Sequence, residues 1–218
     1  MTRPIAYLAV DGVRVPSVTS IIRHVDADNE GLLRWAWKCG QQGITLEDAR
    51  KTAANVGTIA HAAIEADIKG EPCDLSALDP ETLAKVTSAV DAWRLWCASS
   101  GYEGSVASEL SLVSELHRYG GTLDAVLSVR GERTLIDFKT GGALYGKELA
   151  QIAAYGALWN EHHPDHPIAR YSLLRLDRDS AGFTWRHMHA VSMEPAWTAF
   201  LRARELYDLS KTLKNIVG

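Results

Sequence analysis

The chain has 218 residues, 46% of them hydrophobic and 23% charged, which is the composition of an ordinary globular protein of one domain. The net charge of -4 argues against a generic basic protein that coats nucleic acid. The sequence has no run of about 18 apolar residues, no apolar signal-peptide core and only three cysteines, so we expect a cytoplasmic protein that does not contact membranes.

Residues 1–50 are predicted to form an N-terminal helical extension. Ser17 is a helix-capping residue before a short helix, and Glu30–Cys39 has the leucine and tryptophan content of a second helix. A longer helix is predicted over Thr45–Lys69, because apolar residues recur there on one face.

The middle of the chain alternates between helical and strand patterns. Asp79 followed by Pro80 predicts the start of another helix. Three strands rich in β-branched residues are predicted next, at 105–113, 121–130 and 133–139, with a turn at Gly131-Glu132. The remaining predicted elements are a helix at 147–161, strands at 169–177 and 183–191, and a helix at 195–214. The order predicts an α/β fold.

Two carboxylates and a lysine are predicted to meet at one end of the central hairpin. Side chains alternate faces along a strand, so Asp137 and Lys139 point the same way and Phe138 points into apolar packing. Antiparallel pairing brings Asp124, early in its strand, near Asp137, late in the next. The alternative is a surface ion pair, but an aspartate inside the apolar run 135–138 needs a reason to be buried. Such carboxylates suit a hard cation such as magnesium.

Four motifs in one order carry a resemblance to a known family: Gly57-Thr58-Ile59-Ala60-His61, Gly121-Thr122-Leu123-Asp124, Asp137-Phe138-Lys139-Thr140 and Gln151-Ile152-Ala153-Ala154-Tyr155. The sequence resembles the RecB-like exonuclease branch of the PD-(D/E)xK nuclease superfamily. The resemblance is close from His61 to Tyr155, and the segment Pro16-Ser17-Val18-Thr19 also resembles phage-type and mitochondrial-exonuclease-like members.

The resemblance implies one nuclease domain with a restriction-endonuclease-like core. The core would be a mixed central β-sheet flanked by helices over residues 51–191, with the helical extension before it and a C-terminal helix at 192–218. Relatives with an iron–sulfur cluster need four cysteines, whereas this chain has only Cys39, Cys73 and Cys97, so no cluster is expected.

The resemblance also implies a Mg²⁺- or Mn²⁺-dependent deoxyribonuclease. Its catalytic residues would be Asp124, Asp137 and Lys139, and the metal would be bound by His61, Asp124, Asp137 and the carbonyl of Phe138. An isolated histidine in a helix is more often structural than a metal ligand, and only the resemblance favours the metal role of His61.

Four further residues have roles that the sequence leaves open. Glu65 lies on the helix face of His61 and could orient it or simply be solvated. Glu109 could contact a second cation or its waters, or be an outward-facing strand residue. Gln151 and Tyr155, one helical turn apart, face DNA in the family, although Tyr155 alone would pass for a core residue.

The expected partner is DNA, with a recombination or replication protein as a further candidate, and the setting could be recombination, replication or repair. Two other functions remain open: a nucleic-acid-binding or scaffolding module that has lost catalysis, and an interaction protein with a surface acidic cluster. The sequence does not indicate the strand preference, the polarity, endonuclease against exonuclease action, the number of metals or the oligomeric state.

Overall fold

A five-stranded sheet forms the centre of the protein. The computed structural model describes residues 4–25, 30–141 and 146–217. The sheet has the order β3-β4-β5-β6-β7, and its neighbours are antiparallel except for the parallel pair β5 and β6. Its strands are β3 (Tyr102–Ser114), β4 (Tyr119–Val129), β5 (Glu132–Lys139), β6 (Arg170–Leu176) and β7 (Phe183–His189). The predicted α/β fold with a mixed central sheet is confirmed.

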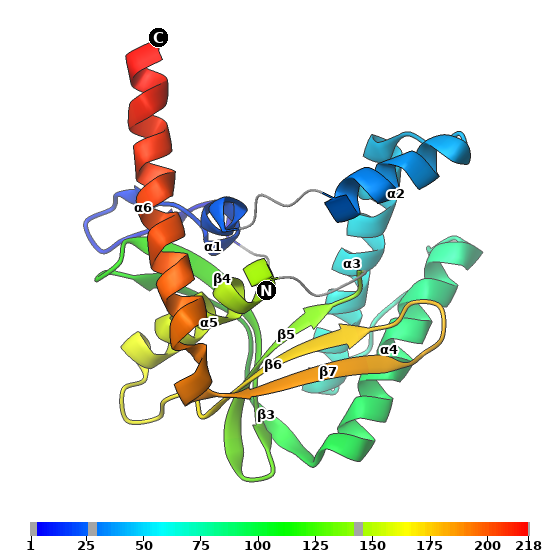
Figure 1. Cartoon of the computed structure of the whole chain (residues 1–218). Coiled ribbons are helices and arrows are strands. Elements are labelled where there is room, and N and C mark those ends of the chain that lie inside the picture. Colours follow the sequence, from blue (N-terminus) through cyan, green and yellow to red (C-terminus); the bar gives the residue numbers. More distant parts are fainter. Residues whose placement is uncertain (1–3, 26–29, 142–145, 218) are drawn as a thin grey trace.

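Helices cover both faces of the sheet (Figure 1). One layer is formed by α3 (Leu46–Lys69) and α4 (Pro80–Ser100), and the opposite layer by α5 (Gly146–His162) and α6 (Glu194–Val217). Strand alternation separates the two cores, because Leu135 packs with α5 whereas Ile136 and Phe138 pack with α3 and α4. Phe138 therefore points into apolar packing, as its strand position predicts.

The smaller helices border these layers. The short helix α1 (Val18–Ile21) and the turn η1 (Ile22–His24) pack with α5 and α6, while α2 (Glu30–Gln41) contacts α3. A second turn, η2 (Ala190–Met193), leads into α6. Among the described residues, no helix combines the length and the apolar character that a membrane span requires.

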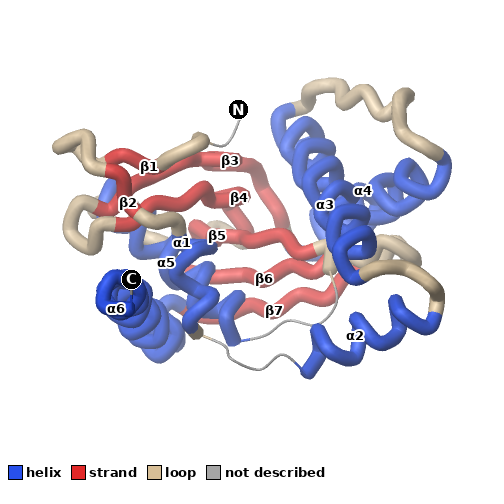
Figure 2. Tube along the Cα trace, turned by 90° about the horizontal axis from the view of Figure 1, so that it is seen from above, coloured by secondary structure: helices blue, strands red, loops and turns tan. Residues whose placement is uncertain are grey.

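The N-terminal segment contains a hairpin that the sequence did not indicate. Strands β1 (Tyr7–Leu8) and β2 (Arg14–Val15) pair with each other and lie beside β3 and β4 (Figure 2). The Tyr7 ring occupies the space above Gly120, where an added Cβ would lie 2.3 Å from the ring. The Tyr7 hydroxyl also hydrogen-bonds Oγ1 of Thr122 at 2.8 Å. Two-residue strands are too short to show an alternating pattern, and packing on β4 stabilises them.

The predicted elements otherwise occur with small shifts at their ends. The helix cap at Asp79 is present, since its side chain accepts the Thr82 N–H. The β4–β5 turn falls at Arg130-Gly131 and not at Gly131-Glu132. Both turn residues have positive φ, +53° and +74°, as a two-residue type I′ hairpin requires.

Candidate functional site

The candidate site lies where β4 and β5 stop pairing. Their ladder ends at the pair Ala125 and Ile136, although β5 continues along β6 as far as Lys139. The next residue of β4, Asp124, accepts the backbone N–H of Phe138 through Oδ2 at 2.9 Å. A side-chain carboxylate thus replaces a backbone acceptor at this point, which anchors Asp124 and leaves its other oxygen, Oδ1, for other contacts.

Oδ1 of Asp124 belongs to a group of possible metal ligands. His61 from α3, Glu109 from β3 and Asp124 from β4 each place one ligand atom within 4.8 Å of the others. Nδ1 of His61 lies 3.5 Å from Oδ1 of Asp124. One imidazole with two carboxylates is a donor set suited to a divalent cation. Three elements far apart in the sequence therefore converge on one potential metal site.

Glu109 reaches this group through an unusual backbone conformation. The residues on either side, Ser108 and Leu110, pair with Ala125 and Leu123, so Glu109 stands opposite Asp124. Its φ is +48°, which is rare for a residue other than glycine and typical of strained functional positions. The side chain is buried. The alternation of side chains between the two faces of β3 is therefore interrupted at Glu109, the residue that contributes a ligand atom.

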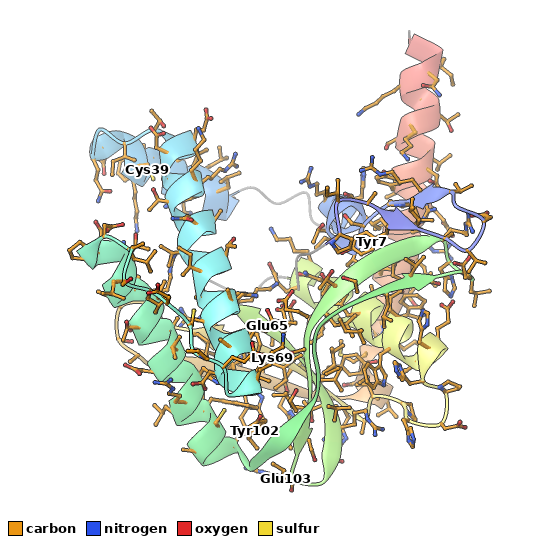
Figure 3. All side chains as sticks on the ribbon, turned by 180° about the vertical axis from the view of Figure 1, so that it is seen from behind. Tyr7, Cys39, Glu65, Lys69, Tyr102 and Glu103 are labelled. Carbon is orange, nitrogen blue, oxygen red and sulfur yellow. The ribbon has the colours of Figure 1, made fainter. Side chains whose placement is uncertain are left out.

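Glu65 does not belong to this group of ligand atoms. It forms an ion pair with Lys69, one turn further along α3, and Figure 3 shows both residues on the half of the helix beside the sheet. The hydrogen bond from Lys69 to Glu65 raises the pKa of the lysine, and the charge of Glu109 adds to this effect. The Glu65–Lys69 pair thus borders the ligand group, and a role of Glu65 in orienting His61 remains a prediction.

The buried Asp137 and the partly exposed Lys139 form an ion pair beside the ligand group. The Asp137 side chain is 2% exposed, and Nζ of Lys139 lies 2.7 Å from its Oδ2 atom. Burial raises the pKa of Asp137 to about 6, because the attraction of Lys139 is partly cancelled by the like charge of Asp124. Burial alone would lower the pKa of Lys139, but the two aspartates outweigh it and raise that pKa. The lysine therefore stays charged.

The Oδ2 atom of Asp137 has no hydrogen-bond partner among the described residues, because the lysine lies off the favourable direction. The nearby Lys139 ammonium offsets the burial of this charge, although the contact is not a well-directed hydrogen bond. Phe138 lies between Asp137 and Lys139 and is fixed through its N–H by Asp124. Its carbonyl as a metal ligand stays a prediction.

Gln151 and Tyr155 extend the site along α5. Nζ of Lys139 donates to Oε1 of Gln151 at 3.0 Å, and Nε2 of Gln151 donates to the Tyr155 hydroxyl at 3.0 Å. Both side chains are buried, and Tyr155 belongs to the apolar core. Its ring lies so close to β4 that a Cβ on Gly121 would come within 2.6 Å of it. Tyr155 is thus a core residue, which was the alternative interpretation, and its contact with DNA stays a prediction.

A cavity of about 540 Å³ adjoins this network and was not foreseen from the sequence. Tyr155 and Thr122 link it to the site, and the hairpin β1–β2, α1 and α6 complete its walls. Among the residues that the structure describes, its lining includes two cations, Arg14 and Lys211, and no carboxylate. Its residues come from both ends of the chain, so no local motif could have indicated it.

The histidines near the end of α5 do not join the site. His163 stacks on Trp159 with ring centroids 3.9 Å apart, and His162 contacts the carbonyl of Val113 at 2.8 Å. Their contacts stabilise the end of the helix.

No known protein-family profile matches the sequence, and no curated protein matches it either. Among solved structures, an alkaline exonuclease from Laribacter hongkongensis is similar at 12% identity and a TM-score of 0.39, over 91% of this chain and 93% of that one. A provisionally assigned exonuclease from Eubacterium rectale is similar at 10% identity and a TM-score of 0.42, over 72% and 68% of the two chains. These values do not establish a family.

Proposed function

We propose that this protein is a metal-dependent DNA nuclease of the PD-(D/E)xK type, of the RecB-like branch, and that it attacks DNA at an end. One observation carries the proposal: the ligand atoms of His61, Glu109 and Asp124 converge beside the ion pair of Asp137 and Lys139. A structural ion pair alone would not need three further acidic or imidazole groups directed at the same point.

The residues present fit a divalent cation. His61, Glu109 and Asp124 would hold it, with Asp137 and the carbonyl of Phe138 as additional ligands. The burial of two carboxylates, Asp124 and Asp137, beside this group supports the fit, because two buried negative charges need more positive charge than the one ammonium of Lys139 supplies. When bound, Mg²⁺ or Mn²⁺ would supply an activated water and neutralise charge on a phosphate.

The chain's own residues have separate tasks around such a cation. Lys139 is charged and partly exposed, and it would stabilise the negative charge that develops on the phosphate oxygens during hydrolysis. Gln151 accepts from Lys139 and donates to Tyr155, so it holds the ammonium in a defined position. Asp124 accepts the Phe138 N–H, and this bond joins β4 to β5 beyond the end of their ladder.

The cavity next to Tyr155 supports attack at an end. A space of about 540 Å³ is enough for a nucleotide of an unpaired strand, and Arg14 and Lys211 are complementary to its phosphate. The described residues of its lining include no carboxylate, in contrast to the overall charge of -4.

The test is digestion of end-labelled linear DNA beside closed circular duplex and circular single strands, with Mg²⁺, with Mn²⁺ and with a chelator. We expect cleavage of the linear DNA only, dependent on metal. Rapid cutting of the circular substrates would show an endonuclease. Metal-independent DNA binding without cleavage of any substrate would favour the inactive binding or scaffolding module.

A further inference from the structure

Gly57 is a glycine in the interior of the long helix α3. It lies well away from both ends of the helix, Leu46 and Lys69. Glycine lowers the stability of a helix relative to alanine, because its backbone has more freedom to lose on folding. The local sequence therefore gives no advantage to a glycine here, and a reason for it has to come from the tertiary structure.

The surroundings of Gly57 supply that reason. A Cβ added to Gly57 would lie 3.2 Å from Oγ1 of Thr140, closer than the 3.4 Å at which ordinary van der Waals contact begins. Thr140 directly follows β5 and is itself buried. The missing side chain thus lets α3 approach the chain immediately after the motif that contains Asp137 and Lys139.

A second contact between α3 and this strand lies one helical turn further along. The rings of His61 and Phe138 meet edge to face, with centroids 5.9 Å apart and an angle of 87° between the rings. Side chains two apart on an extended chain share a face, so Phe138 and Thr140 both point to α3. Four residues of helix rise about 6 Å and two residues of extended chain span about 6.6 Å, so both contacts can form at once.

We propose that Gly57 and Thr140 are positioning residues for the imidazole of His61. Their contact sets how closely α3 approaches the sheet, and at this approach Nδ1 of His61 lies 3.5 Å from Oδ1 of Asp124. A side chain at position 57 would displace its neighbours by a few tenths of an ångström and so move the imidazole away from the carboxylates. The inference rests on the proposed metal site, to which it adds the residues that place one of the ligands.

The position of the imidazole matters more for some cations than for others. Imidazole nitrogen is a good ligand for Ni²⁺, whereas Mg²⁺ prefers oxygen ligands and keeps several waters. Displacement of His61 should therefore weaken the binding of Ni²⁺ more than the binding of Mg²⁺, because the carboxylates of Glu109 and Asp124 stay in place. A general loss of folded protein would weaken the binding of both cations alike.

The experiment measures Ni²⁺ and Mg²⁺ binding to the whole metal-free chain by titration calorimetry, without DNA. The chain has eight histidines, so His61→Ala defines the part of the Ni²⁺ binding that depends on this imidazole. In Gly57→Ala we expect the Ni²⁺ dissociation constant of that part to rise about tenfold, and the Mg²⁺ constant to rise less. The matched control is Gly40→Ala in α2, where an added Cβ meets no atom within 4 Å, and it should leave both constants unchanged.

Substitutions of Thr140 distinguish positioning from a loss of stability. Thr140→Ala removes the atom that the new Cβ would meet, so the double variant Gly57→Ala, Thr140→Ala should recover most of the wild-type Ni²⁺ affinity. Thr140→Val keeps a group of the same size in this place, so the double variant Gly57→Ala, Thr140→Val should not recover it. Chemical denaturation of every variant gives the folded fraction by which each affinity is corrected.

The possible outcomes separate this inference from the proposed function. Unchanged Ni²⁺ affinity in Gly57→Ala would overturn the inference and leave the metal site intact. An equal loss of Ni²⁺ and Mg²⁺ affinity, with no recovery in the Thr140→Ala double variant, would also overturn it, since the glycine would then act on stability alone. A wild type that binds neither cation would overturn the proposed function, and the inference with it.

Discussion

The two ends of the β4–β5 hairpin differ, although the same two strands form both. At the turn, Arg130 and Gly131 adopt the backbone that two-residue hairpins need, and the ladder is complete up to Ala125 and Ile136. At the other end the ladder stops, and Asp124 bonds the Phe138 N–H with its side chain. Local backbone geometry forms the turn end. At the other end, called the open end, a polar side chain replaces the backbone hydrogen bonds of the ladder.

This difference separates residues that stabilise the fold from residues proposed to act on substrate. At the turn end, a substitution should cost stability and leave activity per folded molecule unchanged. At the open end, the ion pair of Asp137 and the partly exposed Lys139 contributes little to folding by itself, because burial of the Asp137 charge costs about as much as the attraction returns. The following predictions test that separation, beginning with the largest effect.

The largest effect is expected for Asp137→Ala. It removes a predicted metal ligand, so DNA hydrolysis should be abolished and metal binding by calorimetry should be lost or strongly weakened. It also removes the ion-pair partner of the partly exposed Lys139, which should lower stability, so Asp137→Asn should be compared and both reported per folded molecule. Asp91→Ala, an exposed aspartate of α4, is the control. Hydrolysis that survives both substitutions would refute the site.

Lys139→Ala should lose activity by at least about 100-fold and keep metal binding. A protonated lysine cannot bind a cation, and removal of its charge should leave metal affinity equal or higher. Calorimetry and single-turnover hydrolysis measure the two quantities separately. Lys38→Ala, an exposed lysine of α2, is the matched control. Equal metal binding in the Lys139 and Asp137 variants, with hydrolysis unimpaired in either, would mean that the motif is only an ion pair on a hairpin.

Tyr155→Ala should destabilise the protein by about 3 kcal/mol, because its ring is part of the core and fills the space beside Gly121. Tyr155→Phe keeps the ring and loses only the hydroxyl that Gln151 binds, at about 1 kcal/mol. A contact of the ring with DNA predicts that the alanine variant also loses about 1–3 kcal/mol of binding per folded molecule. Unchanged binding per folded molecule would leave Tyr155 with a core role alone.

Metal affinity should decrease as the pH falls through about 6. The pKa of Asp137 is raised to about 6, so the carboxylate form that binds a cation is present above this pH and the protonated form below it. Protons and metal compete for the same oxygen, and the apparent affinity should fall by up to about tenfold per pH unit below the pKa. Titration calorimetry from pH 5 to pH 8 measures this. Asp137→Asn should remove this part of the pH dependence.

The smallest effect is expected at the turn. Gly131 has a φ of +74°, so Gly131→Ala should cost about 1 kcal/mol through backbone strain. Hydrolysis per folded molecule should be unchanged, because the turn lies at the opposite end of the strands from Asp124 and Asp137. Chemical denaturation and the linear-DNA assay provide the two measurements. Activity loss greater than the loss of folded protein would show that the two ends are coupled.

The sequence by itself determined those features that depend on neighbouring residues. Strand alternation predicted that Asp137 and Lys139 share a face while Phe138 enters the core, and the structure confirms it. Antiparallel pairing predicted that Asp124 and Asp137 lie at the same end of the sheet, and the hydrogen bond from the N–H of Phe138, the neighbour of Asp137, to Oδ2 of Asp124 confirms it. Each inference needs only the period of a strand and the length of a turn.

Only the tertiary structure decided which distant groups meet. Glu109 joins His61 and Asp124 because its backbone adopts a positive φ opposite Asp124, a state that no sequence period predicts. Tyr155 is buried because Gly121 on another element leaves room for its ring. The hairpin β1–β2 and the cavity depend on contacts between segments more than a hundred residues apart, such as Tyr7 with Thr122. Local patterns carry no information on such pairings, because packing of the whole chain selects them.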